Sequence, residues 1–359
     1  MAFSMLCNSL GGCTSTTESS GTSTTDSSTS AADASSSEAD KASAVGSYSD
    51  TITLVWYPNE SAEDYQEARN EVGRLVEQAT GKQVEQKLTT DYAIAIESLS
   101  NGSAQIGCCM GTEGYIQAKN SNDAVNPLFV QSGESGTLED ALYYSFFAVR
   151  EEDTANYTDG DGYSIDNIKG KKMSFVSNSS TSGFKVPTNQ IISHFAEDNL
   201  IVDDLLEGGS DTFFSEVLFG GSHQGSAFNL LSGKCDVAAF CDIELAPYVT
   251  CTDGEVAAVG AVYTVNDDAS APFDTVTGSK FTVIQSIPVL NGPFAYNANT
   301  LSPEDVQAIQ ELFTSDEVAN DELIFYPEGS MGLLEKESDE MGFVTVEDSW
   351  YDPIRNMES

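Results

Sequence analysis

"KKMSFVSNSSTSGFKVPTNQIISHF", residues 171–195, is the stretch that decides the fold. Its first six residues form a short strand-like run, and its last residues have the apolar spacing of a helix. Between them, residues 177–183 hold five hydroxyl side chains and one glycine. The stretch therefore predicts a strand–turn–helix unit with an unusually polar turn.

The rest of the chain repeats this unit, which predicts an α/β protein with mostly parallel sheets flanked by helices. We expect strands at 51–57, 82–88, 104–110, 126–132, 141–149, 171–176, 212–219 and 235–241. We expect helices at 61–81, 91–102, 112–120 and 302–313, from Ser182, from His223 and from about Ile243. Ser61 and Asp64 have capping-box spacing at the start of the first helix. The pattern restarts after residue 149, which indicates two lobes.

Composition limits the partners of the chain. Its 359 residues include 15 Lys and Arg against 57 Asp and Glu, for a net charge of −42. Such a charge excludes nucleic acid and anionic membrane surfaces. It does not exclude a buried anion site, because surface charge is screened beyond roughly 8–10 Å. No stretch approaches the roughly 20 apolar residues of a membrane-spanning helix.

The first residues, "MAFSMLCNSLGGC", end in Leu10-Gly11-Gly12-Cys13, which resembles a bacterial lipobox. We therefore expect 1–13 to be the remnant of a lipoprotein signal and Cys13 to be lipidated at the outer face of the cell membrane. Residues 14–45, rich in Ser and Thr, are expected to form a disordered tether. The first basic residue is Lys41, whereas a signal peptide starts with basic residues. Either the true start lies upstream, or the segment is a disordered tail with a chance cysteine.

Seven cysteines show no zinc-finger spacing, and the five beyond Cys13 are interpreted as small buried apolar residues. The sequence alone does not exclude a disulfide between Cys241 and Cys251. The sequence predicts no metal site and no cofactor.

The turn at 177–183 has two interpretations. The start of a helix offers unpaired N–H groups, Ser180, Thr181 and Ser182 can add hydroxyl donors, and Gly183 allows close approach of the backbone. Together they would cradle a tetrahedral oxyanion. The alternative is ordinary helix capping, for which one hydroxyl suffices. We favour the cradle because the cluster exceeds what a cap needs.

Further candidates stand at other strand-to-helix turns, where α/β sheets bind ligands. His223 follows Gly220-Gly221-Ser222 at a helix start and could donate an N–H to an anion; the other histidine, His194, is interpreted as a helix-surface residue. Tyr92 begins a helix, either facing the ligand or packing on the strand. Tyr143 and Tyr144 alternate on one strand. Asp242 or Glu244 could accept a hydrogen bond from a ligand that carries a proton.

These segments resemble a known family. Ser180-Thr181-Ser182-Gly183 with Pro187 is similar to the STSGxxxP signature of the phosphonate-, phosphite- and phosphate-binding proteins of bacterial ABC importers. "DYAIAIESLSNGSAQIG" (91–107), "YYSFFAV" (143–149) and "GSHQGSAFNLLSGKCDVA" (221–238) resemble further segments of that family. The resemblance covers most of residues 51–315. It implies ligand-binding roles for the following residues: Tyr92, Tyr143, Ser180, Thr181, Ser182, His223 and Asp242, or Glu244 in place of Asp242.

The resemblance implies a type II periplasmic-binding fold whose two lobes close around a small oxyanion. Crossovers are expected near Ala148 and Pro288. Lobe 1 would comprise 51–147 and, after the chain returns, 290–359, and lobe 2 would comprise 148–289. The implied protein is a monomer that delivers its ligand to the membrane permease of an ABC importer and has no enzymatic activity.

Three rival functions have some support in the sequence. Ser180, His223 and Asp242 could be imagined as a catalytic triad, but the chain lacks a G-x-S-x-G elbow. The same fold could bind an organic cation or vitamin precursor through Trp56, Tyr57 and Tyr92. The chain could also be a tethered ligand sensor, although it contains no kinase or receptor segment.

Overall fold

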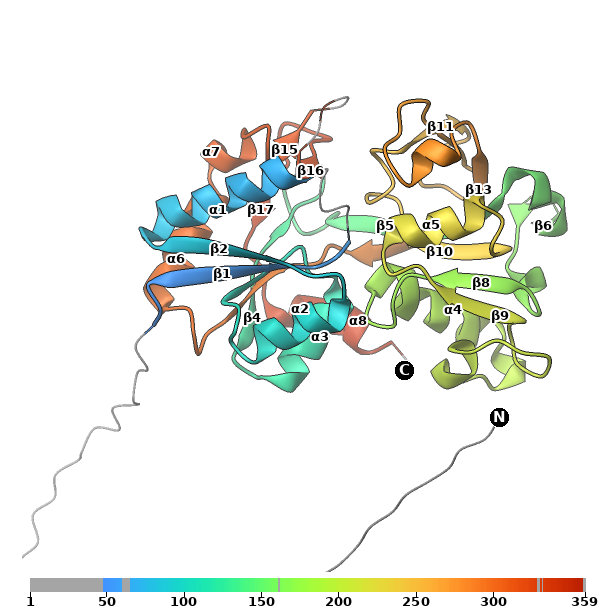
Figure 1. The fold of residues 1–359 in the computed structure, drawn as a ribbon, viewed down its shortest axis with the longest axis horizontal. Coiled ribbons are helices and arrows are strands. Elements are labelled where there is room, and N and C mark those ends of the chain that lie inside the picture. The colour runs from blue at the N-terminus through green and yellow to red at the C-terminus, as the bar shows by residue number, and fades with distance from the viewer. Residues whose placement is uncertain (1–47, 60–64, 161, 328–329, 331, 358–359) are drawn as a thin grey trace, which may run out of the picture. The chain divides into compact units, whose positions relative to one another are not determined.

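The computed structural model describes residues 48–59, 65–160, 162–327, 330 and 332–357. The expected lipidation site Cys13, the tether 14–45 and the capping box at Ser61 and Asp64 lie outside the described residues. The described chain contains two main sheets, seen side by side in Figure 1.

The first sheet has six strands in the order β17-β4-β14-β3-β1-β2. Their bounds are β1 Thr51–Trp56, β2 Gln83–Leu88, β3 Ile106–Cys108, β4 Val125–Gln131, β14 Phe294–Asn297 and β17 Phe343–Val344. Strands β2, β1 and β3 pair in parallel, whereas β14 runs antiparallel between β3 and β4. We call this sheet with its helices the first lobe.

Helices pack on this sheet through apolar stripes. They are α1 Gln66–Thr80, α2 Tyr92–Ser100, α3 Thr112–Ser121, α6 Pro303–Phe313, α7 Asp316–Ala319 and α8 Asp352–Arg355. Helix α1 buries Val72, Leu75 and Val76 on one face and ends at Gly81, whose φ of 68° suits glycine. Helix α6 begins at Ser302, whose hydroxyl accepts the N–H of Asp305 at 3.1 Å. Among the described residues, no helix is long and apolar enough to cross a membrane.

The second sheet has seven strands in the order β11-β12-β13-β5-β10-β8-β9. Their bounds are β5 Leu142–Arg150, β8 Lys172–Phe175, β9 Glu216–Phe219, β10 Val237–Cys241, β11 Val249–Asp253, β12 Val262–Val265 and β13 Lys280–Leu290. Helices α4 Val186–His194 and α5 His223–Leu231 pack on this sheet, and together they form the second lobe. Two small strand pairs, β6 Thr158–Asp159 with β7 Gly162–Tyr163 and β15 Phe325–Tyr326 with β16 Leu334–Glu335, lie outside both sheets.

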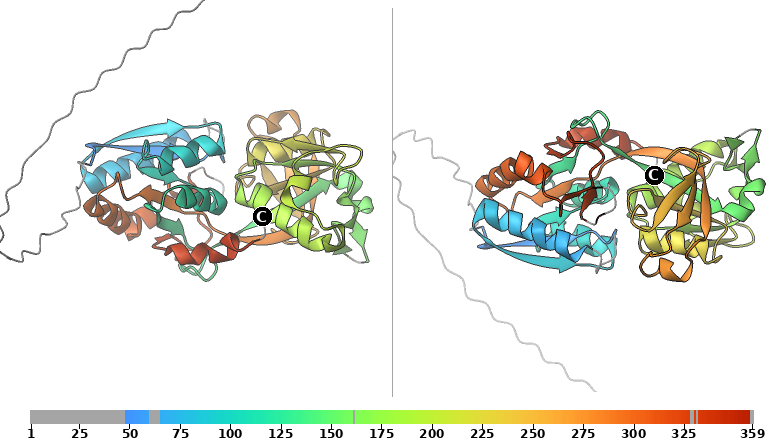
Figure 2. Two further views of the ribbon diagram at one scale, coloured as in Figure 1. Left: turned by 90° about the horizontal axis from the view of Figure 1, so that it is seen from below. Right: turned by 90° about the horizontal axis from the view of Figure 1, so that it is seen from above.

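The two lobes are joined where β5 and β13 pair. These strands run antiparallel from Leu142↔Leu290 to Arg150↔Phe281. Sheet membership changes over residues 132–141 on the way out and 291–293 on the way back, as Figures 1 and 2 show. The sequence places the first crossover near Ala148, which lies within β5 in the second sheet. The lobe boundaries at 148 and 290 stay a prediction.

The two-lobed α/β architecture is confirmed, with differences in detail. Within the two main sheets of the described chain, parallel pairing joins only β2–β1–β3 and β10–β8–β9, so antiparallel pairs are more frequent than predicted. The helix predicted from about Ile243 is wrong. Residues 242–248 form turns in which Leu245 and Ala246 both donate to the carbonyl of Asp242, and Pro247 has no N–H to continue a helix.

The cysteines of the described chain form no disulfide. All five in the described part, Cys108, Cys109, Cys235, Cys241 and Cys251, are free thiols. The possible disulfide between Cys241 and Cys251 is therefore absent from the described chain.

Candidate functional site

The hydroxyl-rich turn follows β8 and leads into α4 through a π-helical segment, Thr181–Lys185. Ser180 caps it, because its Oγ accepts the N–H of Gly183 at 3.1 Å. A Cβ at position 183 would lie 2.2 Å from Cγ2 of Val176, so only glycine fits there. The residues 180–183 are buried. We call residues 180–183 the cradle.

The cradle hydroxyls keep hydrogens available for a ligand. The Oγ of Ser180 and the Oγ1 of Thr181 each accept a backbone N–H, from Gly183 and, at 2.8 Å, from Glu113. Since each oxygen uses a lone pair in this way, each O–H remains free to donate. The hydroxyl of Ser182 hydrogen-bonds with the side chains of Tyr143 and Cys241.

His223 is the first residue of α5 and is 4% exposed. Ser222 caps the helix by accepting the N–H of Gly225 at 3.0 Å. The Nδ1 of His223 accepts the N–H of Cys241 at 3.1 Å, which places the ring hydrogen on Nε2. Burial lowers the pKa of His223 to about 3, so the imidazole is neutral and supplies a single N–H donor.

Three tyrosines lie in one apolar cluster that spans both lobes and includes Cys241. Tyr57 and Tyr92 meet edge to face, with ring centroids 4.4 Å apart. The phenol of Tyr92 donates to Oδ1 of Asn59 at 3.1 Å. Tyr143 enters from β5 in the second lobe. Burial raises the pKa of all three phenols, so they remain protonated donors.

The two candidate carboxylates differ in their surroundings. Oδ1 of Asp242 accepts the backbone N–H of Tyr144 at 2.9 Å, and burial raises the pKa of Asp242 to about 6. Glu244 is 8% exposed, and its charge raises the pKa of both Tyr92 and Tyr143, whereas that of Asp242 acts on Tyr143 alone. Glu244 is thus the acid whose charge acts on phenols from both lobes.

Gln224, the residue after His223 in the sequence, carries a hydrogen-bond acceptor in addition to the two carboxylates. Its side chain is buried, and its Nε2 donates to the carbonyl of Glu244 at 3.1 Å. That bond fixes the orientation of the amide. The other end, Oε1, is buried and has no hydrogen-bond partner within the described chain. A buried acceptor of this kind is satisfied when a ligand donates to it.

Positive charge is missing from the electrostatics of this group. The carboxylates that act on the three phenols are Asp91, Glu113, Asp242 and Glu244. Within the described ranges, no lysine or arginine contributes to the pKa of these phenols. Because Tyr57 and Tyr92 already donate to Ser179 and Asn59, the donors that the group offers are hydroxyls, the phenol of Tyr143, one imidazole N–H and helix-terminal N–H groups.

Most residues predicted from sequence are buried, namely Tyr92, Tyr143, Ser180, Thr181, Ser182 and His223. Asp242 lies beside them but directs Oδ1 to its own sheet. His194 is partly exposed and pairs with Asp166 at 2.5 Å, as expected of a surface residue. Gln117 and Gln224 were not predicted as site residues from the sequence, and Tyr57 was predicted only as a possible cation-binding aromatic. The sequence signal that could have indicated Gln224 is the helix start that Ser222 caps two residues earlier.

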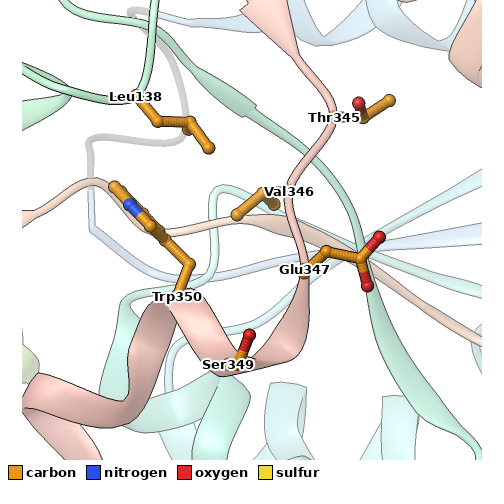
Figure 3. Close-up of a pocket in the computed structure, with 6 residues that line it drawn as sticks. All are labelled: Leu138, Thr345, Val346, Glu347, Ser349 and Trp350. Atoms are coloured by element: carbon orange, nitrogen blue, oxygen red, sulfur yellow. The ribbon is translucent and has the colours of Figure 1, made fainter.

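Two cavities lie elsewhere. Figure 3 shows one of about 320 Å³, lined by Leu138, Thr345, Val346, Glu347, Ser349 and Trp350. The other, of about 260 Å³, is lined mainly by Arg150–Glu152 and Gly278–Lys280. Neither includes a residue of the cradle or its surrounding phenols, so neither is the candidate site.

Comparison with known proteins agrees with this geometry. Residues 54–351 match the family described as the periplasmic substrate-binding protein of phosphonate ABC transporters. The chain is 26% identical over 314 residues to the phosphate-import protein PhnD of Mycolicibacterium smegmatis, covering 86% of this chain and 85% of that protein.

Solved structures show the same fold. A binding protein of an ABC phosphonate transporter from Pseudomonas aeruginosa aligns with a TM-score of 0.57 and 18% identity, over 86% of this chain and 85% of that one. PhnD1 from Prochlorococcus marinus, solved with methylphosphonate, aligns with a TM-score of 0.61 and 13% identity, over 86% and 97%. These likenesses show the type II periplasmic-binding fold.

The raised pKa of Asp242 predicts how stability depends on pH. The folded chain holds this proton more tightly than the unfolded chain, so the free energy of unfolding falls as pH rises from about 4 to about 6. Asn can still accept from Tyr144 but cannot ionise. A shift from 3.8 to about 6 corresponds to about 3 kcal/mol, and partial exposure reduces this to about 1–2 kcal/mol. We expect Asp242→Asn to be more stable than wild type by that amount at pH 7.5 and equal to it near pH 4.

Urea unfolding at pH 4, 5, 6 and 7.5 measures this difference. Asp203→Asn, at an exposed position, is the matched control and should follow wild type throughout. A difference between Asp242→Asn and wild type that is the same at every pH would contradict the prediction.

Proposed function

This chain belongs to the family of periplasmic phosphonate-binding proteins of ABC transporters, and on that premise we propose that the cradle and its surrounding phenols bind a phosphonate, phosphite or phosphate ion. Proteins of this family are substrate-binding components of importers and not enzymes. The mycobacterial relative is named for phosphate import, and the cyanobacterial one was solved with methylphosphonate. Both ligands are therefore candidates here.

The observation that carries the proposal is the convergence of neutral donors without a cation. Ser180 and Thr181 present free O–H groups, and His223 presents one N–H. Two helical starts, at the cradle and at α5, add oriented N–H dipoles. Hydrogen bonds from fixed neutral groups stabilise an oxyanion in a buried place, where each is stronger than in water.

The acceptors of the site restrict the ligand further. The carboxylate of Glu244 and Oε1 of Gln224 can only accept hydrogen bonds, so they match a ligand that carries a proton. That proton belongs to an acid O–H or to the amine of an aminophosphonate. We assign the site carboxylate to Glu244 in preference to Asp242, because Glu244 acts on phenols from both lobes.

An organic cation is the second candidate ligand, since Tyr57, Tyr92 and Tyr143 lie in one cluster and the charge of Glu244 acts on Tyr92 and Tyr143. A cation would use phenol faces and would leave the cradle hydroxyls unpaired. Thermal-shift screening over phosphate, phosphite, methylphosphonate, aminoethylphosphonate and choline separates the two. Stabilisation by choline alone would favour the cation.

We also propose that the protein acts as a monomer outside the cytoplasm, anchored by lipid at Cys13. The lipobox-like Leu10-Gly11-Gly12-Cys13 supports this, although it lies outside the described residues. Expressed in a bacterium with a supplied upstream signal sequence, the wild type should incorporate radiolabelled fatty acid. Cys13→Ala should lose the label, and equal labelling of both proteins would contradict the anchor.

The cradle predicts losses of affinity. Ser180→Ala, Thr181→Ala and Ser182→Ala should each weaken binding of methylphosphonate or phosphate about tenfold or more, because a hydrogen bond to a charged group contributes roughly 1.5–3 kcal/mol. Calorimetry measures the change. Ser302→Ala is the matched control, since it removes a helix cap in α6 and should leave affinity unchanged. Unchanged affinity in all three cradle variants would indicate that the cradle residues serve only as a helix cap.

Protonation of the ligand predicts a pH dependence. His223 is neutral over the working range, so it contributes no change above pH 5. Affinity for methylphosphonate should fall as pH rises through the second ionisation of the ligand, near 6–8 by comparison with phosphate esters, because Glu244 then faces an unprotonated oxygen. Glu244→Gln should flatten this dependence.

Titration calorimetry from about pH 5.5 to 8.5 covers that ionisation. Asp203→Asn, at an exposed position, is the comparison variant and should retain the wild-type slope. Wild-type affinity that stays level or rises with pH would rule out the proton-sensing role of Glu244.

A further inference from the structure

We propose that Tyr57 and Gln117 form a latch that holds the two lobes closed through Ser179. Tyr57 directly follows β1 and Gln117 lies on α3, both in the first lobe, whereas Ser179 follows β8 in the second. The phenol of Tyr57 donates to the carbonyl of Ser179 at 2.8 Å. The hydroxyl of Ser179 donates to Oε1 of Gln117 at 3.1 Å. One residue of the second lobe is thus held by two side chains of the first.

The orientation of the Gln117 amide is fixed. Its Nε2 donates to Oε1 of Glu113 one turn earlier on α3, at 2.9 Å, which leaves Oε1 as the acceptor for Ser179. The N–H of Glu113 meets Thr181 of the cradle. Helix α3 therefore contacts the turn twice, through Glu113 to Thr181 and through Gln117 to Ser179. Of the two turn residues, only Thr181 is a proposed ligand-binding residue.

Glycines make room for Tyr57 at this junction. A Cβ at Gly114 would lie 2.2 Å from the phenol oxygen of Tyr57 and 2.6 Å from Cζ. A Cβ at Gly111 would lie 3.4 Å from Cε1 of the same ring and 3.0 Å from Oγ1 of Thr181. Glycine within a helix is less favourable than alanine. Its presence at position 114 is explained by the passage of the phenol towards the second lobe.

Burial makes these contacts effective. Tyr57 is 4% exposed and Ser179 is 7% exposed. Burial also raises the pKa of Tyr57, so its phenol is always a donor. When the lobes separate, the contacts between lobes exchange for contacts with water. They therefore favour the closed state, and the apparent affinity of any ligand is proportional to the population of that state.

This role differs from that of a ligand contact in a measurable way. A residue that touches the ligand changes the affinity for different ligands by different factors. Substitution of a latch residue lowers the closed population, so the substitution changes the affinity for every ligand by one common factor. It also accelerates dissociation while leaving the association rate nearly unchanged.

The test uses the full chain with Tyr57→Phe, Gln117→Ala and the double variant. Calorimetry and stopped-flow kinetics with methylphosphonate and with inorganic phosphate should show each single variant raising Kd roughly 2- to 10-fold, the range of a net hydrogen bond. The factor should be equal for the two ligands and should appear in the dissociation rate. Gln307→Ala is the control, because Gln307 bonds only Glu311 on the exposed face of α6 and should change nothing.

Small-angle scattering of the ligand-free proteins provides a readout that does not depend on the ligand. The double variant should have a larger radius of gyration than wild type. If Tyr57→Phe fails to fold, Ser179→Ala removes the donor to Gln117 and takes its place. The affinity measurements rest on the proposed function, so absence of binding by wild type would count against that function alone.

Two results would overturn the latch. One is identical scattering from the wild type and the double variant. The other is a change in Kd for one ligand and not the other, which would make Tyr57 or Gln117 a ligand contact.

Discussion

The antiparallel pairing of β5 with β13 is the constraint on which the rest of the structure depends. Both passages between the sheets leave from the end where Leu142 meets Leu290. Near the same end, β5 carries Tyr143 and Ser145, and the hydroxyl of Ser145 donates to the carbonyl of Ser182 at 2.7 Å. Ser145 also pairs with Cys241, whose N–H orients His223. One strand pair therefore joins the lobes and positions the cradle.

Local sequence signals predicted the parts of the site that depend on local structure. A small hydroxyl-rich turn before a helix specifies Ser180 to Gly183, because capping and close approach are decided by neighbours in sequence. The glycines and Ser222 before His223 specify a capped helix start in the same way. The alternation of strands and helices likewise predicted the α/β class, since each element carries its own periodicity.

Contacts between distant segments could not be predicted this way. Tyr57 meets Ser179 across 122 positions and Gln117 meets it across 62, and no local pattern encodes either contact. The proposed preference for Glu244 over Asp242 also came from the structure, because Oδ1 of Asp242 accepts the N–H of Tyr144 within β5, whereas the charge of Glu244 acts on phenols from both lobes. The predicted helix after Cys241 failed for a local reason, because Pro247 has no N–H to continue it. Asp242 turns the chain there, and Gln224 then holds the carbonyl of Glu244.

The neutral donors of the site have a consequence for capture of an anion from different media. With a net charge of −42, the chain repels an approaching anion, and no lysine or arginine of the described chain acts on the phenols of Tyr92 and Tyr143 to offset this. Dissolved salt shortens the reach of that repulsion to about 8 Å at physiological ionic strength and about 3 Å at 1 M. Encounters therefore become more frequent in brine, whereas the short contacts that retain the ion are little affected. Salt therefore favours encounter with an anion here, whereas it slows encounter between an anion and a binder lined with arginine.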